Sequence, residues 1–496
     1  MRSMRASLAA LILAGPLATA AAQEPVDSAV VRFYDGRWQQ LAWVRSNGLS
    51  PDAATLLTVL AAAGRDGLDS AAYVTPALDA LLHQHLAPAD AWRLDSLLTR
   101  AFFTYARDVS QGRVDPASVD TQWTSTRQAG DLVARLERAM DRGTMGPLLR
   151  GLSPPQPGYA ALRAALERYR EIARHGDWPA RLGRRLAAEG YDTVAGVDSA
   201  VRVFQTRHGL TPDGVVGPVT QAALAVPAAA RGDQIALNME RWRWLPRQLG
   251  ARYLMVNSAA FTLTLVEHDS VAWTTRAITG RTDWPTPIVS GRATQLLFRP
   301  KWKVPRVIAA RELLPSILQD TAFLERERFH VFGDSSLGGK ELDPHSINWT
   351  AVTESTFTYQ LVQEPGGDNP LGGVKLVFWN PFSVYIHDTP APPLFEKRLR
   401  TFSHGCVRIE HAAELVGRLL PDWPEDSIRA AMSRGGERWV RLSRAIPVHL
   451  SYWTAWVTDS GLVAFAADPY GWDLELERAL HGARAIPIVI EEGTSP

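Results

Sequence analysis

The chain has 496 residues, of which 46% are hydrophobic and 21% charged, an ordinary balance for a globular protein. At about 150 residues per domain, this length predicts roughly three domains. The formal net charge is +1, which excludes a broad basic surface and an acidic tail. We therefore expect no nucleic-acid partner.

The first residues, 1–22, have the pattern of a secretory signal peptide. Arg2 and Arg5 precede a short apolar run at 6–13, and small residues up to Ala22 offer a cleavage site. The run is shorter than the roughly 20 apolar residues that cross a bilayer. We therefore predict export and a soluble mature protein. An uncleaved membrane anchor stays open as an alternative.

The region 25–176 has a helical pattern throughout. Its last part spaces four apolar residues by four, three and three positions, which places them on one helical face. They are Leu162, Leu166, Tyr169 and Ile172. We find no chemical constellation in this region, and we interpret His83 and His85 as surface residues.

A compact unit follows at 179–226. Asp198 is the expected N-cap of one helix, and Pro218 is expected near the start of another. Between them, "TPDGVVG" predicts a tight turn. The next segment, 227–251, begins with "PAAARG" and is predicted as a linker.

From residue 252 the period changes to that of strands, and 252–280 predicts a β-meander. Further strands are expected at "VKLVFWN" and "SVYIHD". Between them and the meander, 304–369 combines a helical piece with loop signals. An insert of this size predicts a lid or binding element. A hairpin and a helix are expected in 446–496.

Cys406 is the only cysteine of the chain, so it has no internal disulfide partner. In an oxidising compartment an unpaired thiol is a liability unless it is buried or has a chemical role. A free thiol has a pKa near 8.5, so a catalytic one needs a base. The candidate bases are His404 and His387, which is 19 residues before the cysteine.

Strand alternation favours the distant histidine. Val384 and Ile386 point to one side of the predicted strand, and Tyr385 and His387 point to the other. If Ile386 faces the core, His387 faces a cleft. A neighbouring strand that carries Cys406 then brings the thiol to the imidazole, which can take its proton and hold a thiolate–imidazolium pair.

The residues around the thiol suggest the rest of a site. Gly405 leaves room for substrate, and the N–H groups of Gly405 and Cys406 are candidates for an oxyanion hole. Arg408 has two open interpretations, since its guanidinium can meet a substrate carboxylate or an internal acid.

Two non-catalytic interpretations remain open at this point. A lone buried cysteine is usually a small hydrophobe. Alternatively, a metal site could use four side chains, although zinc sites usually show paired ligands at recognisable spacing. These four are His387, His404, Cys406 and His411. We expect no metal and no other cofactor, and we interpret His411 as a helix cap or surface residue.

"SHGCVR", with a histidine 19 residues upstream in "YIHDTP", resembles the active-site signature of L,D-transpeptidases. "NMERWRWLP" and "RTDWPTPIVSG" resemble flanking stretches of the large Gram-negative members. "SQGRVDPASVDTQW" resembles their helical scaffold domain, and "AVRVFQTRHGLTPDGVVGPVT" resembles their small peptidoglycan-binding domain. The resemblance covers nearly the whole mature chain.

The resemblance implies a multidomain α+β fold. Its parts would be a signal peptide (1–22), a helical scaffold (25–176), a small three-helix peptidoglycan-binding-like domain (179–226), a linker (227–251), a mainly-β catalytic domain (252–445) with a capping insert (304–369), and a C-terminal hairpin and helix extension (446–496).

The resemblance also implies roles. Cys406 would attack the L,D bond between the third and fourth residues of a peptidoglycan tetrapeptide stem, release D-Ala and form a thioester. His387 would be the base, and Asp388 would orient it, by way of its backbone carbonyl. The residues that would support the site or bind substrate are Ser403, His404, Gly405, Asp388 and Arg408.

The implied acceptor is the diaminopimelate amine of a second stem, which gives a 3→3 cross-link in the periplasm. Carbapenems are implied as inhibitors. A carboxypeptidase or amidase that uses the same cysteine and histidine with water stays open, as does a non-catalytic wall-binding protein that works through 179–226. Peripheral association with the cell envelope also stays open.

Overall fold

The computed structural model describes residues 24–46, 48–84, 87–124, 130–320, 322–333 and 339–481. The predicted signal peptide, His85 and the last part of the predicted C-terminal extension lie outside the described residues. Within those ranges, no helix has the length and apolar character that crossing a membrane requires.

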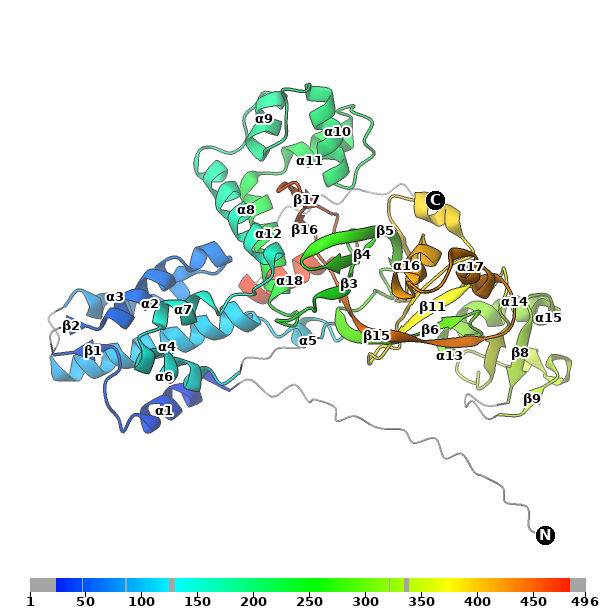
Figure 1. The fold of residues 1–496 in the computed structure, drawn as a ribbon, viewed down its shortest axis with the longest axis horizontal. Coiled ribbons are helices and arrows are strands. Elements are labelled where there is room, and N and C mark those ends of the chain that lie inside the picture. The colour runs from blue at the N-terminus through cyan, green and yellow to red at the C-terminus, as the bar shows by residue number, and fades with distance from the viewer. Residues whose placement is uncertain are drawn as a thin grey trace, which may run out of the picture.

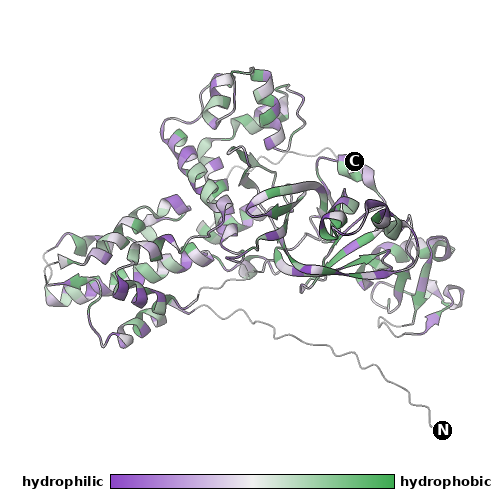
Figure 2. Ribbon diagram, in the orientation of Figure 1, coloured by the Kyte–Doolittle hydropathy of each residue, from purple (hydrophilic) through white to green (hydrophobic). Residues whose placement is uncertain are grey.

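A helical lobe forms the N-terminal part of the molecule, coloured blue to cyan in Figure 1. Its helices and short strands are α1 (Val26–Gly36), β1 (Val44–Arg45), β2 (Gly48–Leu49), α2 (Pro51–Ala61), α3 (Pro76–Leu82), α4 (Pro88–Gln111), α5 (Pro116–Val119), α6 (Leu132–Arg142) and α7 (Met145–Arg150). Proline begins α2, α3 and α4, where its missing N–H costs no helical bond. Leu94, Leu98 and Phe102 of α4 are buried in the lobe's core. Figure 2 shows hydrophobic and hydrophilic positions alternating along these helices, as amphipathic packing requires.

Helix α8 (Pro157–Arg174) joins the helical lobe to the rest of the chain. Its predicted face is buried at Leu162, Leu166 and Tyr169, while Ile172 is half-buried. This face packs on α12 (Ala228–Trp242).

The linker predicted at 227–251 is therefore wrong, because α12 occupies most of it. Ile235, Met239 and Trp242 follow a helical period and are buried against α8. Trp242 also stacks on Trp453, with 4.4 Å between ring centroids. The alanine- and glycine-rich start of the segment conceals this period.

A small three-helix lobe, as predicted, lies at the top of Figure 1. It consists of α9 (Leu182–Glu189), α10 (Val197–Arg207) and α11 (Pro218–Ala225). Pro218 begins α11 as expected. The N-cap prediction is wrong, because Gly196 occupies the N-cap position of α10 and Asp198 lies in its first turn.

The central sheet has nine strands in the order β13-β5-β14-β12-β11-β6-β15-β3-β4, and a further pairing of β5 with β4 closes it on itself. Its strands are β3 (Arg252–Asn257), β4 (Thr262–Glu267), β5 (Ser270–Gly280), β6 (Val289–Phe298), β11 (Val374–Phe378), β12 (Ile386–His387), β13 (Thr401–Ser403), β14 (Val407–Ile409) and β15 (Arg438–Ser451). The predicted meander is β3–β4–β5, antiparallel throughout. The predicted domain boundary at 445/446 falls inside β15, a single strand that pairs with both β6 and β3.

One face of this sheet encloses a core, which we call the inner face. Leu376, Ile386 and Val407 belong to it, and α16 (Ala412–Leu419) and α17 (Glu425–Ser433) pack into it. The opposite face is the outer face. At β3 its side chains Tyr253 and Met255 pack with α8 and α12, and at β11, β12 and β14 it carries polar side chains.

A second unit is inserted between β6 and β11, which are neighbouring antiparallel strands with Phe298 opposite Val374. We call residues 299–373 the capping subdomain. Its four-stranded sheet has the order β7-β10-β8-β9. Its elements are β7 (Trp302–Lys303), α13 (Arg306–Ile308), a π-helix (Ala309–Leu313), α14 (Leu314–Gln319), α15 (Phe323–Arg326), β8 (Phe329–Phe332), β9 (Glu341–Leu342) and β10 (Gln360–Gln363). It has its own apolar core around Ile317, Val331 and Leu361, so it packs as a unit rather than as a loop.

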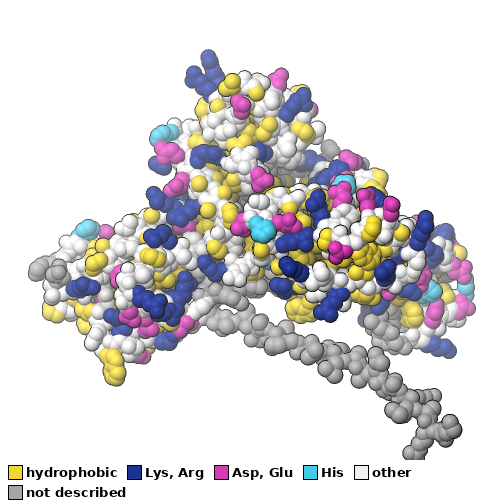
Figure 3. All heavy atoms as spheres, viewed as in Figure 1, with side chains coloured by type: hydrophobic (Ala, Val, Ile, Leu, Met, Phe, Trp, Pro, Cys, Tyr) yellow, Lys and Arg dark blue, Asp and Glu magenta, His cyan; other side chains and the backbone are white. Residues whose placement is uncertain are grey.

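The last described residues form the predicted hairpin and helix. These are β16 (Ala455–Val457), β17 (Val463–Phe465) and α18 (Trp472–His481). Gly461, in the turn, has φ 77°, a conformation that favours glycine. On the face shown in Figure 3, basic and acidic side chains are interspersed, as the near-zero net charge implies.

Candidate active site

The parallel pairing of β12 with β14 brings together the histidine and the cysteine that the sequence singled out. Ile386 lies opposite Val407, and His387 lies opposite Arg408. Because Ile386 and Val407 are buried in the inner core, their strand neighbours point to the outer face. Cys406 immediately precedes β14 and is half-buried, so the register places it on the same face as His387, one strand away.

The orientation of His387 is set by a backbone bond. Its Nδ1 lies 2.6 Å from the carbonyl oxygen of Asp388. A carbonyl only accepts, so Nδ1 carries the proton and the neutral ring keeps its free lone pair on Nε2. The Asp388 carboxylate faces elsewhere, since its Oδ2 accepts from the Gly373 N–H at 2.8 Å.

A tight turn presents the thiol. Gly405 has φ 93°, which a side chain rarely adopts. The Thr286 hydroxyl donates to the Gly405 carbonyl at 2.9 Å, and the Ser403 hydroxyl donates to the Cys406 carbonyl at 2.5 Å. Within the described ranges, the N–H groups of Gly405 and Cys406 have no hydrogen-bond acceptor. Two unpaired donors therefore lie beside the sulfur.

His404 is turned toward the capping subdomain. Its Nε2 lies 2.6 Å from Oε1 of Glu312, in the π-helix. Arg281 donates to the same oxygen at 2.9 Å, and the Trp284 ring lies edge-on to His404 with 5.1 Å between centroids. His404 thus connects the turn that carries Cys406 to the capping subdomain. Glu312 carried no signal in the sequence, because its partner is 92 residues away.

The electrostatics favour a neutral thiol and a neutral imidazole. Burial raises the pKa of the Cys406 thiol, against the opposing effects of the Tyr385 hydrogen bonds and of the Lys375 and Arg408 charges. Burial lowers the pKa of His387 to about 3, and the positive charges of Arg408 and Lys375 lower it further. Desolvation and the charges of Arg408 and Lys375 thus oppose a thiolate–imidazolium pair in this state, whereas hydrogen bonds to the Asp388 and Leu371 backbones favour a charged ring.

Two further residues of this cluster were missed by the sequence reasoning. The Tyr385 hydroxyl hydrogen-bonds the Cys406 sulfur, and burial, with that neighbour, raises the Tyr385 pKa. Lys375 has its Nζ 4.8 Å from the centre of the Tyr385 ring. A signal for Lys375 was present, because the lysine alternates with buried Val374 and Leu376 in β11.

Two histidines named in the sequence lie elsewhere. His411 is half-exposed at the start of α16, with its ring nitrogens 3.7 Å from Glu410 and Glu414; it makes no side-chain capping bond. His83 is exposed beside Asp79. The four histidine and cysteine ligands of the metal alternative are not gathered, since His404 and His411 face carboxylates away from the thiol.

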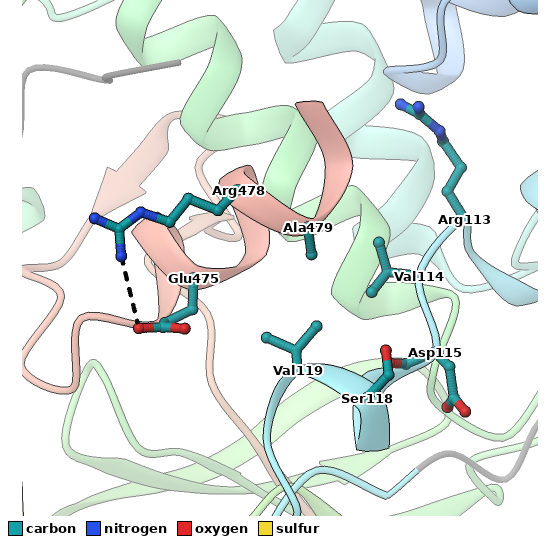
Figure 4. Close-up of a pocket in the computed structure, with 8 residues that line it drawn as sticks. All are labelled: Arg113, Val114, Asp115, Ser118, Val119, Glu475, Arg478 and Ala479. Atoms are coloured by element: carbon teal, nitrogen blue, oxygen red, sulfur yellow. Dashed lines mark hydrogen bonds and ion pairs between the residues drawn. The ribbon is translucent and has the colours of Figure 1, made fainter. Parts of the chain in front are cut away.

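A separate cavity of about 600 Å³ opens between α5 and α18. Figure 4 shows Arg113, Asp115 and Ser118 on one side and the Glu475–Arg478 ion pair on the other. None of the residues lining this cavity belongs to the cysteine cluster.

The outer-face cluster therefore combines a thiol, an oriented imidazole and unpaired N–H donors beside a capping unit, which is the composition of an acyl-transfer site. Residues 251–426 match the sequence model of the L,D-transpeptidase catalytic domain. Residues 28–166 match a "Scaffold domain", and 181–224 match a "Putative peptidoglycan binding domain". The chain therefore carries a region of the L,D-transpeptidase catalytic-domain type, together with a scaffold domain and a peptidoglycan-binding-type domain.

A curated relative, "Putative L,D-transpeptidase" of Haemophilus influenzae (strain ATCC 51907 / DSM 11121 / KW20 / Rd), is 27% identical over 248 residues. That alignment covers 50% of this chain and 49% of the relative. The chain thus spans about half the length of the curated relative that it matches.

Solved structures of L,D-transpeptidases are also similar to parts of the chain. One from Mycobacterium smegmatis is 15% identical, covers 40% of this chain and 58% of its own, and has a TM-score of 0.19. LdtMt1 in complex with imipenem is 16% identical with the same coverages and a TM-score of 0.20. Residues 123–326 of the Xylanimonas cellulosilytica enzyme are 17% identical, cover 60% and 96%, and have a TM-score of 0.20.

Proposed function

We propose that this protein is a peptidoglycan L,D-transpeptidase that forms 3→3 cross-links through a Cys406 thioester. The observation that carries the proposal is the placement of Cys406 beside His387, whose Nδ1 is fixed by the Asp388 carbonyl at 2.6 Å. That bond leaves Nε2 available as the base. The match of 251–426 to the L,D-transpeptidase catalytic domain supports the same reaction class.

In the first half-reaction, the sulfur attacks the carbonyl carbon of the third stem residue while Nε2 of His387 takes the thiol proton. The resulting oxyanion accepts hydrogen bonds from the N–H groups of Gly405 and Cys406. When the tetrahedral intermediate collapses, the C–N bond breaks and His387 gives its proton to the leaving amine of D-Ala. The stem is then held as a thioester on Cys406.

In the second half-reaction, the side-chain amine of diaminopimelate on another stem attacks the thioester carbon. His387 takes a proton from this amine and returns it to the sulfur as the C–S bond breaks. The resting thiol and a 3→3 peptide bond result. The neutral resting pair suits this sequence, because the proton moves during attack rather than beforehand.

The capping subdomain supports transfer to an amine over transfer to water. Its Glu312 bonds His404, two residues from the thiol. A closed cap limits the access of water, which competes with the amine for the thioester. The small three-helix lobe would hold the enzyme on peptidoglycan, as its match to a binding domain supports.

We further propose that the protein works in the periplasm after export. The support is the signal-peptide pattern of 1–22, with its positive start, short apolar run and small-residue cleavage site. The substrate of the proposed reaction lies in that compartment.

The test is product analysis by mass spectrometry after incubation with a disaccharide-tetrapeptide. The proposal predicts a cross-linked dimer and released D-Ala with the unchanged enzyme, and neither with Cys406→Ala. Tripeptide product without dimer would indicate an L,D-carboxypeptidase instead. Cross-linking that survives Cys406→Ala would contradict the thioester route.

A further inference from the structure

Two cations flank the imidazole in one row across the outer face. Lys375 of β11 lies opposite His387 of β12, and His387 lies opposite Arg408 of β14. Side chains of residues paired in this way point to the same face of the sheet. The register therefore places a lysine and an arginine on either side of the histidine, next to the Cys406 thiol.

Neither cation has a carboxylate partner in the part of the chain that the structure describes. Nε of Arg408 is buried without a hydrogen bond. The carboxylate whose charge acts on Lys375 is that of Glu437, and Oε1 of Glu437 accepts from the Lys301 N–H at 3.0 Å.

Three of the other buried arginines, Arg185, Arg241 and Arg243, are paired with carboxylates, whereas Arg231 bonds only an amide and a main-chain carbonyl. Arg185 bonds Glu189 at 2.6 Å, and Arg243 bonds Glu240 at 2.7 Å. A desolvated guanidinium without an anion is costly. The register thus places two cations without a carboxylate partner beside the thiol, an arrangement suited to binding an anion.

We propose that Arg408 and Lys375 bind the C-terminal carboxylate of the donor stem, on the residue that leaves. This proposal rests on the proposed function and names the recognition element of the same site. In the donor, that carboxylate carbon is three bonds from the carbonyl carbon attacked by the sulfur. Arg408 is two strand positions beyond Cys406, about 7 Å along β14, within reach of that carboxylate through its long side chain.

This placement makes the site selective for where the stem ends. A guanidinium binds a carboxylate through two parallel hydrogen bonds, so the pair fixes the length of chain between the attacked carbonyl and the terminus. A stem with one more residue carries its carboxylate past the pair. A stem whose terminus is amidated carries no charge to meet it.

Filling the site also strengthens the base. The positive charges of Arg408 and Lys375 lower the pKa of His387, and a bound carboxylate offsets them. His387 thereby becomes a better proton acceptor when a correct donor is in place. Recognition and activation are coupled through the same two side chains.

The experiment measures binding rather than turnover. In a Cys406→Ala background, isothermal titration compares the tetrapeptide L-Ala-γ-D-Glu-diaminopimelate-D-Ala with the same peptide bearing a C-terminal carboxamide. The free acid is expected to bind about tenfold more tightly or better. Adding Arg408→Gln is expected to bring the affinities for the acid and the amide within about twofold of each other. Lys375→Gln is expected to reduce the preference for the acid, and Arg408→Lys is expected to retain part of that preference.

Arg441→Gln is the matched control, because Arg441 is an exposed arginine on β15 of the same sheet. Its ratio of acid to amide affinity should equal that of the parent Cys406→Ala protein. Equal binding of acid and amide by the parent, binding of neither, or a preference that survives both glutamine changes would overturn the proposal. The ratio of acid to amide affinity within one variant is insensitive to partial misfolding.

The two proposals can fail separately. If the unchanged enzyme forms product but acid and amide bind equally, the proposed function stands and the carboxylate site is wrong. If the acid binds more tightly than the amide but no product forms, only the proposed function is contradicted.

Discussion

Nδ1 of His387 lies 2.6 Å from the backbone carbonyl oxygen of Asp388, the next residue in the chain. The orienting group is thus a main-chain atom, and the neighbouring carboxylate is occupied by the Gly373 N–H. This arrangement separates the role of the imidazole from that of the aspartate side chain, and the two are open to separate tests.

Replacing the imidazole should abolish most acylation, while replacing the carboxylate should not. For His387→Ala we expect the rate of Cys406 acylation to fall about 10²- to 10⁴-fold, because proton transfer is lost. For Asp388→Asn we expect a change within about threefold, since the backbone carbonyl remains. Both rates are measured by intact-protein mass spectrometry over time. A loss with Asp388→Asn as deep as with His387→Ala would show that the carboxylate is required.

Cys406 should rest as a protonated thiol at neutral pH. Because burial raises the pKa of Cys406 and outweighs the opposing effects of Tyr385, Lys375 and Arg408, the thiolate forms only as the pH rises above the ordinary range of a cysteine. Alkylation by iodoacetamide, followed from pH 6 to 10, should therefore increase through the whole range. The absorbance of the thiolate at 240 nm should be absent at pH 7 in the difference against Cys406→Ala. A plateau of alkylation already reached at pH 7 would contradict the neutral resting pair.

The conformation of Gly405 should matter more than that of a matched surface glycine. Gly405 has φ 93°, and an added Cβ would lie 3.4 Å from the Pro285 carbonyl oxygen. Gly435 has φ 80° with nothing within 4 Å of an added Cβ. Gly405→Ala and Gly435→Ala should each cost about 1 to 2 kcal/mol of unfolding free energy, measured by urea denaturation.

Only the first change moves the thiol and its neighbouring N–H groups. Acylation should therefore fall at least tenfold with Gly405→Ala and stay near the parent rate with Gly435→Ala. Equal acylation by both variants would show that the turn does not position the reacting groups.

The Glu312–His404 contact should control the partition between amine and water. Glu312→Gln removes the charge that holds His404 and Arg281, which loosens the capping subdomain at the cysteine turn. We expect the ratio of tripeptide to cross-linked dimer to rise severalfold. Glu354→Gln is the control, because Glu354 pairs with Arg311 on an exposed part of the same subdomain. An unchanged ratio of tripeptide to dimer with Glu312→Gln would show that this contact does not control the access of water to the thioester.

The sequence predicted the parts of the fold that repeat locally. The meander at 252–280, the helix at 157–174 and the outward direction of His387 all follow from alternation or helical period, so they were accessible from local pattern. The helix at 228–242 was missed because its alanine- and glycine-rich start resembles a linker, while its stability comes from Trp242 and Met239 packing on α8.

The residues of the candidate site that belong to a recognisable sequence motif could be predicted. Cys406, Gly405 and His387 stand out by residue type and spacing. Glu312 does not stand out, because the capping insert creates its relation to the thiol. Lys375 is marked by its alternation with apolar residues, but only the pairing of β11 with β12 places it beside His387. The protonation state was not accessible either, since burial and two flanking cations set it.

Cys406 is proposed to carry the stem as a thioester, and intact-protein mass spectrometry with a tetrapeptide donor detects this intermediate. We expect an adduct equal to the donor mass minus D-Ala, located on Cys406 by peptide mapping and absent in Cys406→Ala. The adduct should disappear when a diaminopimelate amine is supplied. An enzyme that forms cross-linked product with no adduct on Cys406, or with the adduct on another residue, would show that Cys406 is not the acyl carrier.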